Sequence, residues 1–195
     1  DGGVGAASGG GTGDGAGGGA VKRGCSSARA MLLPAGNWSA PRPWALAVGK
    51  AGKKGTAAAW EVSYGRFTQG ESVEAIAMSQ PSGRPIQVGT VIGHIFQGLV
   101  LGRPMDLQRL SSSSGQEAPP NEEEWGQLED AAARADVDVV QVENVLLKEL
   151  LLSVPGVGPD VPSYWYSKAR WWMSLKRAGV PVSFGDAPSK RACPL

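Results

Sequence analysis

The chain has 195 residues, which is enough for one modest domain, but 29 glycines and 14 prolines shorten the part that can form regular structure. No apolar run approaches the roughly 20 residues that a membrane-spanning helix needs, so no spanning segment is expected. One histidine and two distant cysteines cannot supply the usual four zinc ligands without carboxylates, so we expect no metal site and no cofactor.

Charge divides the chain into three parts. Residues 1–56 carry seven basic side chains against two acidic ones, residues 57–154 carry six against fourteen, and residues 155–195 carry six against two. The net charge of +1 hides this pattern. A polyanion such as DNA would be attracted by both flanks and repelled by the acidic middle.

The N-terminal segment, residues 1–55, is predicted to be a disordered glycine-rich stretch followed by a basic linker. Its first 19 positions hold eleven glycines and no apolar side chain larger than valine, so nothing offsets the entropy of ordering them. Lys50, Lys53 and Lys54 suit non-specific phosphate contact or, equally, a solubilising or nuclear-targeting role. The start at Asp1, with the first methionine at Met31, indicates a fragment.

Three short helices are predicted after residue 56, because the apolar spacing there follows the helical period. The first spans residues 57–68, the second follows the N-cap Ser72, and a turn rich in proline and glycine precedes the third, which Thr90 caps. The third helix ends near Gly102 and has these apolar side chains at helical spacing: Ile92, Ile95, Phe96 and Leu99. Three short helices with a turn before the last describe a helix-turn-helix.

Two further helices are predicted before residue 154. Asn121 caps a helix that reaches about Ala135 and has three glutamates in its first turn. Asp138 caps the next helix, which Pro155 ends and whose apolar face is Val139, Val142, Leu146 and Leu150. The expected fold is all-α, a small helical bundle over residues 56–154 whose outer face carries the surplus carboxylates.

Sequence runs in this region resemble a known family. The runs Gly-Glu-Ser-Val-Glu-Ala-Ile-Ala at residues 70–77 and Thr-Val-Ile-Gly-His-Ile at residues 90–95 are similar to the helicase helix-turn-helix domain near the C-terminus of RecQ-family DNA helicases, arranged as in the Werner-type enzymes. The resemblance covers residues 56–154, with an extra Pro-Ser-Gly-Arg-Pro stretch between the two runs. It implies a helix-turn-helix or winged-helix-like fold and an accessory role beside upstream ATP-hydrolysing domains, in DNA repair or recombination in the nucleus.

The predicted third helix offers few groups to DNA. Its polar side chains are Thr90, His94 and Gln97, and it has no lysine or arginine for a phosphate. We therefore favour a packing or docking role for this helix and keep DNA contact through these three residues as the alternative. Because Gly93 and Gly98 weaken a helix, a close helix-helix approach is the expected reason for them.

Residues 155–195 are predicted to form an aromatic and basic tail with an amphipathic helix over residues 163–178. Aromatic side chains interleave with cations there, as on surfaces that bind single strands. The candidate nucleic-acid contacts are Lys168, Arg170, Trp171, Trp172, Lys176 and Arg177. The alternative, which aromatic stripes at helical spacing favour, is that the aromatic side chains pack on the helical core or on a partner protein.

Two functions follow from these patterns. The first is an accessory nucleic-acid-binding module of a RecQ-like or Werner-like helicase, which binds single-stranded or forked DNA with low, salt-dependent affinity beside upstream helicase domains and repair proteins. The second is a protein-interaction module that docks the helicase or a repair partner without touching DNA.

No phosphate loop or Gly-x-Ser-x-Gly turn occurs, so the fragment itself is not expected to be an enzyme. Two remote cysteines favour free thiols in a soluble intracellular protein, with the nucleus as the expected location.

Overall fold

The computed structural model describes residues 28–49, 52 and 55–185. This part of the chain is mostly helical, as predicted, with four short strands that the sequence analysis did not anticipate. None of its helices is long and apolar enough to cross a membrane. In chain order the elements are β1 (Ala30–Leu32), β2 (Asn37–Trp38), α1 (Ala59–Thr68), α2 (Val73–Met78), α3 (Val88–Val100), β3 (Met105–Asp106), α4 (Leu107–Ser113), the 3-10 helix η1 (Gly115–Glu117), α5 (Glu122–Arg134), α6 (Leu147–Leu152), α7 (Ser163–Ala178) and β4 (Ser183–Gly185).

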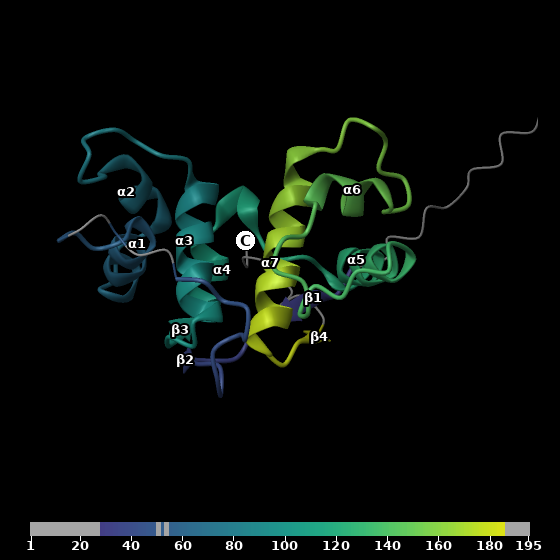
Figure 1. Cartoon of the computed structure of the whole chain (residues 1–195), viewed down its shortest axis with the longest axis horizontal. Coiled ribbons are helices and arrows are strands. Elements are labelled where there is room, and N and C mark those ends of the chain that lie inside the picture. The colour runs from purple at the N-terminus through teal and green to yellow at the C-terminus, as the bar shows by residue number, and fades with distance from the viewer. Residues whose placement is uncertain (1–27, 50–51, 53–54, 186–195) are drawn as a thin grey trace, which may run out of the picture.

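Helix α3 lies between the α1–α2 pair and α7 (Figure 1). Its side chains Ile92, Ile95 and Leu99 are buried because they share the helix faces that meet these neighbours. The helix begins at Val88 after the N-cap Gln87, so the predicted cap Thr90 lies inside its first turn instead.

Helices α1 and α3 approach each other closely at Gly98. A Cβ atom at Gly98 would lie 2.5 Å from Cδ2 of Tyr64, and the hydroxyl of Tyr64 donates a hydrogen bond of 2.6 Å to the carbonyl of Pro104. The expected close approach is therefore confirmed at Gly98. The same prediction is wrong for Gly93, where an added Cβ atom would meet no atom within 4 Å.

Helix α7 joins two hydrophobic clusters. Trp171 and Leu175 belong to the cluster around α1, α2 and α3, whereas Ala169 and Trp172 belong to the cluster that α5 and α6 complete. The predicted helix over residues 163–178 is confirmed. The buried core extends well beyond residues 56–154, because α7 is packed between the two halves of the molecule rather than forming a separate tail (Figure 1).

The short strands attach the two ends of the described chain to the helices. β1 pairs antiparallel with β4, with Ala30 opposite Gly185, and β2 pairs antiparallel with β3, with Trp38 opposite Met105. Residues 28–49 are thus part of the fold and not the linker that was predicted, because their backbone groups are bonded to strands far along the chain. The predicted disorder of residues 1–27 and the candidate cations Lys50, Lys53 and Lys54 lie outside the described residues.

The helix predicted after Asp138 is reduced to α6. Residues 139–146 are not helical, because side chains from elsewhere take the carbonyl groups that a helix would use. Trp44 donates its indole N–H to the carbonyl of Val140 at 2.7 Å. The guanidinium group of Arg177 donates to the carbonyls of Val139 at 2.9 Å and Val142 at 2.9 Å.

Candidate functional site

The predicted polar side chains of α3 lie on one face of the helix. Thr90, His94 and Gln97 are spaced at i, i+4 and i+7, and Thr90 is exposed while the other two are half-buried. This face carries no lysine, arginine, aspartate or glutamate.

His94 is held against α1 by a hydrogen bond. Its Nδ1 lies 2.9 Å from the hydroxyl oxygen of Ser63, a buried residue. Burial lowers the pKa of His94, because the imidazolium form would lose solvation there. The lowered pKa favours the neutral imidazole near pH 7, and among the described residues the hydroxyl of Ser63 is the side-chain hydrogen-bond partner of His94.

The loop that contains Trp44 and Val48 is hydrogen-bonded to the C-terminal half of α3. The side-chain amide of Gln97 donates to the carbonyl of Val48 at 3.2 Å, and the backbone N–H of Trp44 donates to the carbonyl of Val100 at 2.8 Å. Among the described residues, this loop covers Gln97 and leaves the N-terminal half of the polar face uncovered.

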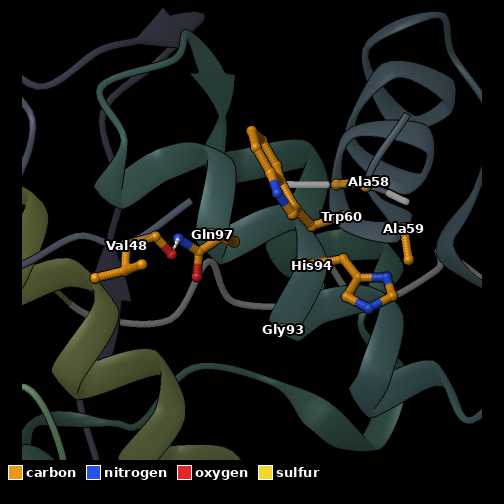
Figure 2. Close-up of a pocket in the computed structure, with 8 residues that line it drawn as sticks. Val48, Ala58, Ala59, Trp60, Gly93, His94 and Gln97 are labelled. Carbon is orange, nitrogen blue, oxygen red and sulfur yellow. Dashed lines mark hydrogen bonds between the residues drawn. The ribbon is translucent and has the colours of Figure 1, made fainter. Parts of the chain in front are cut away.

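A pocket opens beside this half, and none of the described residues that line it is a lysine, arginine, aspartate or glutamate (Figure 2). It has a volume of about 340 Å³ and is lined by Val48, Gly52, Ala58, Ala59, Trp60, Gly93, His94 and Gln97. Figure 2 shows His94 and Gln97 on α3, the first residues of α1 on the other side, and the bond from Gln97 to Val48. Sequence reasoning found only His94 and Gln97, because the other lining residues come from segments whose neighbourhood depends on the tertiary fold.

The predicted cations of α7 are engaged inside the chain. Lys168 lies 3.0 Å from the carboxylate of Glu124, and Lys176 lies 2.7 Å from that of Glu129. Arg170 donates to the carbonyl of Gly89 at 2.8 Å, and Arg177 adds a stacking contact with the ring of Trp44, 4.1 Å away, to its bonds with carbonyl groups.

The predicted stacking residues Trp171 and Trp172 are both 0% exposed. Their indole N–H groups donate to the carbonyl of Glu117 at 2.6 Å and to the carboxylate of Glu129 at 2.9 Å. In this conformation neither ring presents a face to a base. These two side chains therefore pack on the core, which is the alternative given for them above.

Within residues 28–49, 52 and 55–185, no group of three or more His, Cys, Asp or Glu side chains is placed to hold a metal ion. No protein-family model, curated protein or solved structure matches this chain.

Proposed function

We propose that the chain is a helix-turn-helix accessory module of a RecQ-type or Werner-type DNA helicase, and that it docks the helicase or a repair partner without direct DNA contact. The observation that supports docking is the open face of α3, which has no lysine, arginine, aspartate or glutamate and borders a pocket whose described lining residues are uncharged and largely apolar. The association with a helicase rests on the resemblance of residues 70–77 and 90–95. The module has no catalytic role in this proposal and acts in the nucleus.

The packing of α1, α2 and α3 supports the helix-turn-helix part of the proposal. Both α1 and α2 contact α3, and the turn before α3 is anchored by a hydrogen bond of 2.9 Å from the N–H of Ile86 to the carbonyl of Ala77. A wing is not included, because the described strands pair with segments far away in sequence rather than as a hairpin after α3.

Docking is favoured over DNA binding because the cations of α7 have other partners. Phosphate contacts require lysine or arginine side chains that are free to neutralise phosphates and so displace the counterions condensed on the nucleic acid. Moving Arg170 or Arg177 to a phosphate would leave backbone carbonyls without their hydrogen bonds, at a cost of about 1–3 kcal/mol for each group that stays buried.

DNA binding is the second candidate, and one observation favours it. Arg84, Gln87 and Thr90 are exposed around the N-terminal end of α3. In helix-turn-helix proteins this end of the last helix contacts base edges. Any DNA contact would then use Arg84 and Thr90 rather than the buried tryptophans of α7.

Binding to a purified ATPase core of a Werner-type helicase tests the docking function. We expect a saturable complex with the full chain that Gly93→Gln weakens at least tenfold, because the new side chain would occupy the pocket. Gly126→Gln is the matched control, because Gly126 also lies inside a helix, α5, and a Cβ atom added there would also meet no atom within 4 Å. Equal binding by both variants, or no complex at all, would contradict docking through this pocket.

Fluorescence anisotropy with single-stranded and forked DNA separates the two candidates. If the chain docks without DNA contact, the full chain should show no salt-sensitive DNA binding between 50 and 200 mM salt. Across this range the affinity of a protein that makes six or more phosphate contacts falls by roughly a thousandfold or more. Salt-sensitive binding that Arg84→Gln removes would establish the second candidate instead.

A further inference from the structure

A groove lies between the end of α5, the segment that follows it and the start of α6. Its volume is about 340 Å³, and its lining is half polar and half apolar, with Val142, Val145 and Leu146 beside Asn144, Glu149 and Ser153. It lies on the opposite half of the molecule from the α3 pocket, since α5 and α6 are separated from α3 by α7 (Figure 1). We refer to it as the α5–α6 groove.

Large apolar side chains stand exposed at this groove. Leu146 is 66% exposed and Val142 is 39% exposed, although the sequence pattern predicts both on the buried face of one helix. Grouped apolar side chains exposed beside a hollow are typical of surfaces that a partner covers. A partner that filled the groove would bury these side chains.

The rim of the groove is acidic. Asp136, Asp138, Glu143 and Glu149 lie in or beside the lining segments, and within the described part of the chain none of them forms a salt bridge. Between residues 130 and 153 the chain has five acidic residues and two basic ones, Arg134 and Lys148, and Arg177 of α7 also reaches this segment through hydrogen bonds to the carbonyls of Val142 and Glu143, so acidic side chains remain in excess by five to three. Arg134 donates to the carbonyl of Ser153 at 2.7 Å. The rim would therefore repel a nucleic acid and attract a basic segment.

We propose that the α5–α6 groove docks a short basic segment of a partner protein, in which a large apolar side chain is flanked by lysine or arginine. The apolar side chain enters beside Leu146 and Val142, and the flanking cations lie against Glu143 and Glu149. This division of roles follows the usual pattern, in which a buried apolar anchor supplies affinity and a charged rim supplies orientation and association rate. The inference rests on the proposed docking function and adds a second surface with a defined partner chemistry.

A synthetic peptide tests this directly. The probe is a 14-residue peptide with leucines at helical spacing in a background of lysine, and two controls replace the leucines by glutamine or the lysines by glutamate. The full chain should bind the probe saturably and more weakly as salt rises, with amide chemical-shift changes centred on residues 135–150. Neither control peptide should bind. Binding by the glutamate peptide, or shifts centred elsewhere, would overturn the proposal.

Variants of the chain locate the contact. Leu146→Gln should weaken probe binding at least fivefold, and Glu143→Lys combined with Glu149→Lys should weaken it at least tenfold. Met78→Gln is the matched control, because Met78 is 69% exposed on α2, far from the groove in sequence. All of these side chains are exposed, so circular dichroism should show an unchanged fold. Unchanged binding by Leu146→Gln would refute the assignment.

The outcomes distinguish this inference from the function on which it rests. Binding of the helicase core without binding of the probe refutes the groove proposal and leaves the docking function in place. Failure of both refutes the docking function as well. A concentration-dependent dimer that Leu146→Gln abolishes would assign the groove to a second copy of the chain and overturn the proposal.

Discussion

At position 98 the helix α3 has room for a hydrogen atom and nothing larger. Gly98→Ala should lower the free energy of unfolding by about 1–3 kcal/mol, because the added methyl group overlaps the ring of Tyr64, which its bond to Pro104 holds in place. Urea denaturation followed by tryptophan fluorescence measures this. Gly93→Ala is the internal control and should raise the same free energy by up to about 1 kcal/mol, since its methyl group enters open space. Equal effects at the two positions would contradict the helix contact.

His94 should make the stability of the fold depend on pH. Because burial lowers its pKa below the ordinary value of 6.5, the unfolded chain binds the proton more readily than the folded one. The free energy of unfolding should therefore fall as the pH drops through 6.5, and should stop falling on this account below the lowered pKa of the folded state. Denaturation of the wild type and His94→Gln at pH 7.5, 6.5 and 5.5 isolates the effect, since the chain has one histidine. If the free energy of unfolding changed with pH in the same way for the wild type and His94→Gln, His94 would not be the source of the pH dependence.

At the scale of single elements, α5 depends on a reciprocal cap at its N-terminus. The side chain of Asn121 accepts a bond of 2.8 Å from the N–H of Glu124, whose carboxylate accepts one of 2.8 Å from the N–H of Asn121. Asn121→Ala should lower the free energy of unfolding by about 1 kcal/mol, as measured by thermal denaturation. Gln127→Ala, on the same helix but outside the cap, should change it by less than about 0.5 kcal/mol. A loss at Gln127 as large as that at Asn121 would argue against a specific cap.

The elements also differ in how well local sequence describes them. The cap at Asn121 and the bounds of α7 were predictable, because caps and apolar spacing act within a few residues. The segment 139–146 has the same kind of spacing, yet its carbonyl groups bond to Trp44 and Arg177. No local pattern carries that information, because Trp44 and Val140 are 96 residues apart.

At the scale of the whole molecule, Trp171 attaches α7, the helix shared by the two halves, to α3. Its ring packs edge-on against Phe96 of α3 with centroids 4.8 Å apart, and its N–H bonds to the carbonyl of Glu117 in η1. Trp171→Ala should lower the free energy of unfolding by about 3–5 kcal/mol and broaden or split the thermal transition. Tyr164→Ala is the control, because Tyr164 lies on the same helix but is 47% exposed, and it should have little effect. A thermal transition of Trp171→Ala as sharp and as high in temperature as that of the wild type would mean that the molecule folds cooperatively without this contact.

By itself the sequence determined the helical class of the protein, the positions of α1, α5 and α7 and the neutral character of α3, because these depend on neighbours within one or two helical turns. The tertiary structure alone decided which side chains a partner can reach. Taken alone, the basic and aromatic side chains of α7 fit either a nucleic-acid surface or packing on the core, whereas the fold buries Trp171 and Trp172 and bonds Arg177 to distant carbonyls. It also leaves Leu146 exposed, although the helical pattern predicts burial. Burial and pairing are properties of contacts between distant segments, and only the assembled fold specifies them.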